Sequence, residues 1–187
     1  MQQLKLNISN ESEIKVIASS AFSFRIELIL DHGLDDLDDI CNISKNLANI
    51  FGNDFLLNED NVLKYFNKNT LPFVARFKGE IIGYIIGVPI EFINQESWAR
   101  YDKNIGKNNT IYTYAFIMNE KYRKVGGYSK TLKKIYLNWS KKNGYKYCTG
   151  HVKQGIAKSF PKTEIVKTFP NWYGSNSIFE YYRRNIY

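Results

Sequence analysis

The sequence predicts a single α/β domain in which a central sheet is covered on both faces. Residues 73–77 and 80–88 are rich in β-branched and aromatic residues, and the Lys78-Gly79 pair between them indicates a β-hairpin. The second arm is apolar on both faces, as expected of a central strand that is covered on both sides. Residues 111–118 form another run of this kind, followed by a glycine turn and a helical pattern.

The helix after this turn is predicted from residue spacing. Leu132, Ile135, Tyr136 and Trp139 fall on one helical face, and lysines occupy most of the other. Residues 141–144, Lys-Lys-Asn-Gly, are typical of a helix end, because their cations lie at the negative end of the helix dipole. The other elements follow from composition and turn signals. Residues 1–20 show no firm pattern; strands are predicted over 22–30 and 145–152, and helices over 34–51, 59–66 and 175–184. A polar loop is expected over 102–109 and an irregular region between Pro161 and Pro170.

Composition sets the class of protein. A chain of 187 residues with 44% hydrophobic residues suits one folded domain and argues against disorder. The longest apolar stretch, residues 81–93, is too short to span a bilayer, and residues 1–5 lack the features of a signal peptide. We therefore expect a soluble, cytoplasmic protein without a membrane partner. Cys41 and Cys148 have no ligand spacing, so neither a metal site nor a disulfide framework is predicted.

Charge is distributed unevenly along the chain. Residues 1–60 carry a net charge of −7 and the remainder +15. The basic part could attract nucleic acid or a polyphosphate cofactor, or be a solvated lysine-rich surface, and nucleic acid is not the expected partner. The acidic run at residues 35–39 could attract an amine, but we favour a role as the acidic N-terminus of a helix.

The glycine turn is a candidate anion site. Gly126-Gly127 precedes a helix, whose first backbone N–H groups have no partner within the helix and add to its positive dipole end. Arg123 and Lys124 place positive charge at the same point. An ordinary strand-to-helix turn remains the alternative, because many such turns contain glycine.

The segment Arg123-Lys124-Val125-Gly126-Gly127-Tyr128 resembles the Gln/Arg-x-x-Gly-x-Gly/Ala signature of the GCN5-related N-acetyltransferases, with Tyr128 departing from the last position. The hairpin at 73–84 is similar to the hairpin of that family. The resemblance covers roughly residues 23–187, with 1–22 as an extension and 153–172 as an insertion before the last helix. It implies a mixed, mainly antiparallel sheet flanked by helices on both faces, and acetyl-coenzyme A as the acetyl donor. The cofactor-binding residues that it implies are Phe116, Ile117, Met118, Arg123, Lys124, Val125, Gly126, Gly127, Tyr128, Ser129 and Asn176.

The resemblance also implies catalytic roles. Tyr182, expected on the last helix, would protonate the leaving thiolate, and Tyr181 is the alternative for this role. The position at which several members carry a glutamate base is Tyr112 here. His151 could act as the base instead, or water could relay the proton with Tyr112 and Tyr114 orienting it. Glu91 is a further candidate.

Residues 171–175 and 180–184 are rich in aromatic and polar side chains. They could line an acceptor pocket, or they could be an aromatic cluster that holds the end of the chain. The function expected is direct acetyl transfer to an unidentified primary amine in a ternary complex. A non-catalytic acyl-coenzyme A-binding module is the alternative, and a second copy of the chain is a candidate partner for the sheet edge.

Overall fold

The computed structural model describes residues 8–20, 23–52, 55–172 and 176–187. In these residues eight strands form one sheet in the order β1-β2-β3-β4-β5-β6-β8-β7. Neighbouring strands are antiparallel except for β5 and β6, which are parallel. The elements in chain order are β1 (Glu13–Ser19), β2 (Phe24–Asp31), α1 (Leu34–Phe51), α2 (Val62–Tyr65), β3 (Pro72–Phe77), β4 (Glu80–Pro89), β5 (Thr110–Met118), α3 (Tyr128–Lys142), β6 (Tyr147–Lys153), β7 (Thr163–Phe169) and β8 (Phe179–Asn185).

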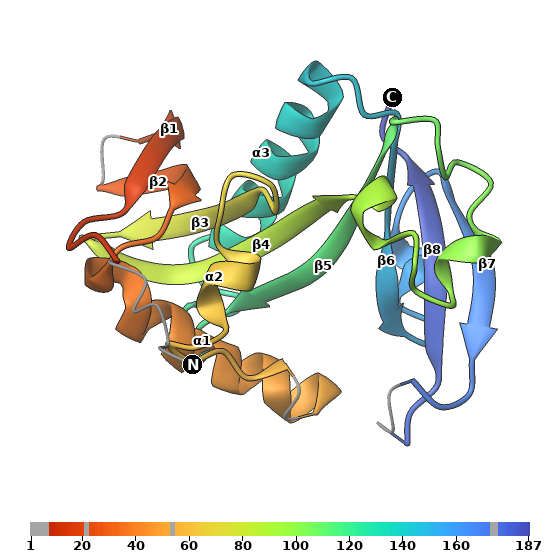
Figure 1. Cartoon of the computed structure of the whole chain (residues 1–187), viewed down its shortest axis with the longest axis horizontal. Coiled ribbons are helices and arrows are strands. Elements are labelled where there is room, and N and C mark those ends of the chain that lie inside the picture. Colours follow the sequence, from red (N-terminus) through yellow and green to blue (C-terminus); the bar gives the residue numbers. More distant parts are fainter. Residues whose placement is uncertain (1–7, 21–22, 53–54, 173–175) are drawn as a thin grey trace, which may run out of the picture.

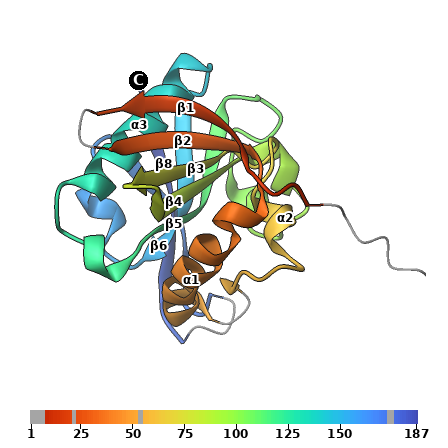
Figure 2. The same ribbon diagram turned by 90° about the vertical axis from the view of Figure 1, so that its left-hand side faces the viewer.

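The predicted mixed, mainly antiparallel sheet with helices on both faces is confirmed. Figures 1 and 2 show α1 and α3 on opposite sides of the strands. On the α1 side, Leu37, Ile40 and Leu47 pack against β4 and β5. On the other side, Leu132 and Tyr136 of α3 pack against the opposite faces of β3 and β4. Because β4 is covered by both helices, its residues from Ile81 to Val88 are buried without alternation, as the sequence predicted.

The predicted final helix is wrong. Phe179–Asn185 is the strand β8, which lies between β6 and β7, and residues 173–175 fall outside the described part of the chain. Five successive residues of β8 are buried, from Phe179 to Arg183. A strand that is buried on both faces shows no alternation of polar and apolar residues, which is why its sequence could be interpreted as a helix.

Two edge strands were also missed. Thr163–Phe169 is β7 rather than an irregular region, and Glu13–Ser19 is β1, in a segment where no pattern was found. Both strands lie at the edges of the sheet and are largely exposed. Edge strands bury few side chains, so they lack the hydrophobic pattern by which a strand is recognised.

Strands β5 and β6 separate after a short paired region. Their pairing covers Thr110–Thr113 against Tyr147–Gly150, and beyond it the two strands diverge (Figure 1). On its other edge β5 pairs with β4, where Thr113 lies opposite Gly87 and Ala115 lies opposite Ile86. Tyr114 is thus the extra residue of a β-bulge, and a bulge bends the strand that contains it. The bend in β5 therefore occurs directly after Thr113, where the pairing of β5 with β6 ends.

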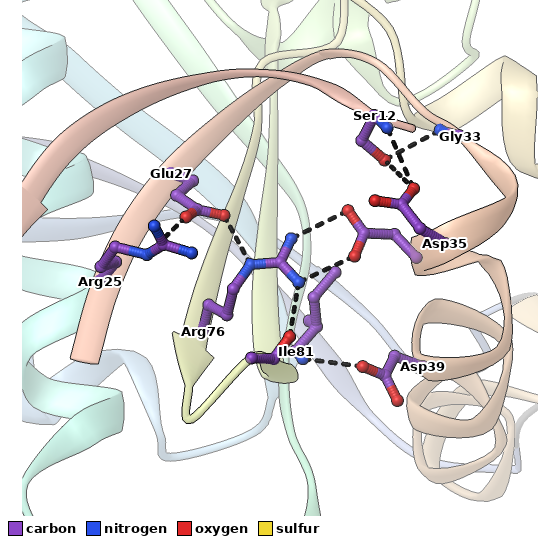
Figure 3. Close-up of polar contacts among 10 residues, drawn as sticks. Ser12, Arg25, Glu27, Gly33, Asp35, Asp39, Arg76 and Ile81 are labelled. Atoms are coloured by element: carbon purple, nitrogen blue, oxygen red, sulfur yellow. Dashed lines mark hydrogen bonds and ion pairs between the residues drawn. The ribbon is translucent and has the colours of Figure 1, made fainter. Parts of the chain in front are cut away.

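A buried ionic network fixes the beginning of α1 against the sheet (Figure 3). Arg76 of β3 donates to Glu27 at 2.8 Å and, through both terminal nitrogens, to Asp36 at 2.9 Å. Asp35 accepts from the backbone N–H and hydroxyl of Ser12, and Asp39 accepts from the backbone N–H of Ile81. Burial alone would lower the pKa of Arg76, but its hydrogen bonds to Asp36 and Glu27 raise it. Three acids of the run at 35–39 therefore serve the fold.

None of the helices in the described residues is long and apolar enough to cross a bilayer.

Removing the charge of Arg76 is expected to destabilise the protein strongly. In Arg76→Met, Asp36 stays buried without its partner and Glu27 keeps only Arg25, which should cost about 3–5 kcal/mol of unfolding free energy in urea titrations. Arg25→Met is the matched control, because the Arg25 side chain is 45% exposed and pairs with the same Glu27. Its loss should stay below about 1 kcal/mol. Equal losses in the two variants would contradict this account of the network.

Candidate active site

The glycine turn forms an exposed backbone cradle at the start of α3. Lys124, Gly126 and Gly127 have φ angles of 60°, 61° and 68°, and residues 123–127 are exposed. Gly127 is the N-cap of α3, and no side chain caps this end of the helix. The first N–H groups of α3 are therefore available to an anion, supported by the helix dipole. These features fit a phosphate or diphosphate group.

Tyr128 departs from the family signature, and its ring lies beside the turn. The ring packs against Phe24 at 4.9 Å and Phe77 at 5.4 Å between ring centroids. A Cβ atom at Gly126 would lie 2.5 Å from the Tyr128 ring. Glycine is thus required at residue 126 both for its positive φ and for the close approach of this ring.

A groove with many basic side chains runs from the cradle along α3. This lysine groove has a volume of about 600 Å³ and is lined by Ser129 together with Lys130, Lys133, Lys134, Lys162 and Arg184. Lys133 lies where the groove meets the sheet, with its ammonium 5.5 Å from the centroid of the Phe116 ring. Burial lowers the pKa of Lys133. The groove can hold several negative charges beside the helix N-terminus.

The divergence of β5 and β6 creates a second cavity. This strand gap has a volume of about 390 Å³, and its walls include Thr113 and Phe116 of β5, Gly150 and His151 of β6, and Tyr182 of β8. Phe116, Lys133 and Arg184 line both the strand gap and the lysine groove. The two cavities are therefore adjacent, and a long molecule held at the cradle can extend along α3 into the gap.

Tyr182 of β8 lines the strand gap. It sits opposite Gly150 on β6, and a Cβ atom at Gly150 would lie 3.3 Å from the Tyr182 hydroxyl. Thr113 and Cys148 are hydrogen-bonding neighbours of this hydroxyl. Burial raises the pKa of Tyr182 well above its usual value, so the phenol is protonated at neutral pH.

An aromatic pocket of about 250 Å³ lies on the α1 side of the gap. Its walls include Phe51, Phe55, Tyr65, Trp98, Tyr114 and Trp172. Phe51, Tyr114 and His151 line both this pocket and the strand gap, so the two are neighbours. The bulged Tyr114 stacks on Tyr65 at 4.9 Å, and the Tyr114 hydroxyl donates to that of Tyr65.

His151 is held between aromatic rings at the boundary of the two cavities. It stacks on Trp172 at 3.6 Å and on Tyr181 at 4.8 Å between ring centroids. The Tyr112 hydroxyl and His151 Nδ1 are hydrogen-bonded at 2.9 Å, whereas Nε2 is buried without a hydrogen-bond partner in the described structure. Burial lowers the pKa of His151 to about 2, so the ring is neutral and a weak base at physiological pH.

The structure brings many of the predicted site residues together. Ser129 lines the lysine groove and follows the exposed turn residues 123–127 in the chain, and Phe116 lies where the groove meets the gap. Tyr112, His151 and Tyr182 surround the gap and the aromatic pocket, with Tyr182 on a strand instead of the predicted helix. The side chains of Ile117 and Met118 are buried in the two cores on either side of the sheet.

Other candidates lie elsewhere or have a structural partner. Asn176 is in the exposed loop before β8, outside the walls of these three cavities. The Tyr181 hydroxyl donates to Asp102 at 2.7 Å, and Glu91 accepts from the backbone N–H of Asn108. Arg183 pairs with Asp102 and Glu164.

Arg184 beside the gap belongs to the segment 180–184, which the sequence indicated as a possible pocket lining. Several other candidate residues were not identified from the sequence: Phe51, Phe55 and Tyr65 near α1 and α2, Glu96 and Trp98 in the connection from β4 to β5, and Lys133 beside the gap. They come from distant segments and belong to no local motif. The aromatic enrichment near Trp172 was noticed, and Trp172 lies in the aromatic pocket, whereas residues 173–175 fall outside the described residues.

Acid should destabilise the protein through its buried histidine. Because the native pKa of His151 is about 2, the unfolded chain binds a proton below about pH 6.5 that the native state does not. Stability should fall with decreasing pH, by about 1.4 kcal/mol for His151 between pH 7.5 and 5.5. Burial also lowers the pKa of His32, which adds to the loss in the same direction.

Urea titrations between about pH 7.5 and 5.5 measure this effect. In His151→Gln, which can retain a hydrogen bond to Tyr112, the loss of stability on acidification should shrink by the His151 contribution. His32→Gln serves as a comparison for a second buried histidine. If His151→Gln has the same pH dependence as the original chain, the ring is protonated in the native protein and our account of its environment is wrong.

No family model matches the sequence, and no curated protein matches it. Solved structures do match the fold. Ard1 from Thermoplasma volcanium is 15% identical with a TM-score of 0.62, over 88% of this chain and 99% of that one. The ribosomal-protein-S18-alanine N-acetyltransferase from Escherichia coli is 12% identical with a TM-score of 0.61, over 87% of this chain and 94% of that one. The loading GNATL domain of CurA from Lyngbya majuscula is 9% identical with a TM-score of 0.62, over 87% and 98%. The chain therefore has the fold of the GCN5-related N-acetyltransferases.

Proposed function

We propose that this protein is an N-acetyltransferase that transfers the acetyl group of acetyl-coenzyme A directly to a primary amine. The observation that carries the proposal is the strand gap, which joins an uncapped helix N-terminus on one side to an aromatic pocket on the other. An elongated donor with a diphosphate at one end and a thioester at the other matches the cradle, the lysine groove and the gap in that order. The shared fold with acetyltransferases supports the same proposal.

In this proposal the cradle and the lysines bind the donor. The N–H groups of Gly127, Tyr128 and Ser129 would bind the diphosphate, with Arg123 and Lys124 adding positive charge beside them. Lys133 and Arg184 would line the path of the donor from the groove into the gap, and Phe116 would contact the uncharged part of the donor. The thioester would then lie near Gly150 and Tyr182.

The chemical step needs no covalent enzyme intermediate. The amine nitrogen attacks the thioester carbonyl carbon, the C–N bond forms, and the C–S bond breaks. Tyr182 protonates the departing thiolate, and the amine loses its proton to water beside Tyr112 and Tyr114. We assign His151 the positioning of Tyr112 and of the incoming amine, because a ring with a pKa of about 2 is too weak a base to remove the proton at neutral pH.

A second candidate is a non-catalytic module that binds acyl-coenzyme A. One observation favours it: the described walls of the strand gap contain no carboxylate, and their histidine is a weak base. The two candidates differ in whether coenzyme A thiol is released from acetyl-coenzyme A across a panel of amines. Tight binding with no release for any amine class would favour the module.

Donor binding is tested by isothermal titration of acetyl-coenzyme A into the original chain and into a variant that places a negative charge at the cradle. Ser129→Glu places a carboxylate in the first turn of α3, where it suits the helix dipole but competes with phosphate. We expect the affinity for acetyl-coenzyme A to fall at least about tenfold while thermal stability is kept. Lys142→Gln makes the same change in charge at the other end of α3 and should bind normally. No binding by the original chain at millimolar concentration contradicts the proposal.

The two adjacent tyrosines of β8 test the proton donor. Tyr182→Phe removes the hydroxyl from the gap and should lower kcat by about 100-fold while the KM for acetyl-coenzyme A is nearly unchanged. Tyr181→Phe is the matched control, because that hydroxyl binds Asp102 and should affect stability more than turnover. If Tyr182→Phe retains full kcat, the thiolate is protonated by another group.

A further inference from the structure

We propose that the aromatic pocket selects the acceptor, and that the acceptor is a compact primary amine with an aromatic or other apolar body, such as a phenethylamine. This inference rests on the proposed function for its reaction, and on the walls of the pocket for its ligand class. The pocket lies across the strand gap from α3, so the acceptor would approach the thioester from the side opposite the donor.

The lining of the pocket matches an apolar ring carrying one positive charge. Phe55, Tyr65 and Trp98 place aromatic rings in the pocket walls, and such rings pack against flat apolar groups and attract cations. Glu96 is half-buried and is the single carboxylate among the described lining residues. An ammonium group can therefore interact with one carboxylate and several π faces, while the body of the ligand meets apolar surface.

The polar groups of the pocket are mostly engaged within the protein. The hydroxyls of Tyr65 and Tyr114 are hydrogen-bonded to each other, and that of Tyr112 is bonded to His151. A sugar with several hydroxyls, or a peptide with several amides, would lose its bonds to water and find few replacements. A polyamine would bury a second ammonium without a second carboxylate among the described walls.

Size points to the same class of ligand. A volume of about 250 Å³ is below the 300–1,000 Å³ that is typical of pockets for drug-sized molecules. One ring with a short side chain is therefore a better match than an extended chain. The short side chain of the ligand would point toward the strand gap, because Tyr114 and His151 line both the pocket and the gap. His151 Nε2, buried and without a partner in the described structure, is positioned to bond the amine where it enters the gap.

Two measurements test this inference. The first is direct binding of phenethylamine, followed by quenching of tryptophan fluorescence, which does not depend on turnover. Trp98 and Trp172 line the pocket, whereas Trp139 packs against Phe73 on the α3 side of the sheet. We expect saturable quenching that persists in Trp139→Phe. Phenethyl alcohol, which has nearly the same shape but no ammonium, should bind about tenfold more weakly.

Variants identify the groups responsible. Glu96→Gln should weaken phenethylamine binding about tenfold and leave phenethyl alcohol binding unchanged. Phe55→Leu keeps an apolar side chain but removes a ring, and should weaken the amine about threefold. Glu59→Gln is the matched control, because Glu59 is exposed and lies outside the pocket lining. Circular dichroism and thermal melting establish that each variant is folded.

The second measurement is release of coenzyme A thiol with phenethylamine, spermidine, glucosamine and a peptide with a free amino terminus. Phenethylamine should have the highest kcat/KM.

Preference for any of the other three, or binding of phenethylamine that Glu96→Gln and Phe55→Leu do not change, overturns the inference. If acetyl-coenzyme A binds but phenethylamine does not, the acceptor class is wrong and the proposed function stands. If phenethylamine binds but acetyl-coenzyme A does not, the proposed function fails while the pocket assignment stands.

Discussion

The separation of β5 from β6 is the constraint on which the rest of the site depends. Parallel pairing ends at Thr113 and Gly150, and the bulge at Tyr114 bends β5 at the same point. From Ala115 onward, the edge of β5 that faces β6 pairs with no strand in the described chain. Such an edge inside a domain leaves backbone groups without partners, and water or a ligand must satisfy them. The bulge also turns Tyr114 toward the α1 side, where it joins the aromatic residues, while Phe116 faces the lysines of α3.

Charge is divided between the fold and the site. Three acids of the first third of the chain hold the amino-terminal half together, since Asp35, Asp36 and Asp39 join α1 to the Ser12 segment, to β3 and to β4. Lys130, Lys133 and Lys134 of α3 line a groove beside a helix end that no side chain caps. A positive groove next to exposed backbone N–H groups thus uses part of the positive charge of residues 61–187, and the buried acids of the first part stabilise a helix.

The sequence was sufficient to predict those elements whose structure is determined by neighbouring residues. Helix α1, the β3–β4 hairpin and α3 were recognised because their residues alternate between buried and exposed sides with a regular period, or turn at Lys78-Gly79. It was insufficient for β8, whose residues are buried on both faces, and for β1 and β7, which bury few side chains. Tyr182 was named as a site residue although its element was predicted wrongly. The aromatic pocket could not be predicted as a whole, because residues such as Phe55, Glu96 and Trp172 meet only after the sheet has formed.

The position of the strand gap between two cavities also bears on the order of events in a catalytic cycle. The lysine groove follows α3 on one side of the sheet, and the aromatic pocket lies on the α1 side. In the proposed function, a donor in the lysine groove and an acceptor in the aromatic pocket would occupy different cavities, so neither would have to bind first. Steady-state kinetics would then show intersecting lines in double-reciprocal plots, as expected of a ternary complex.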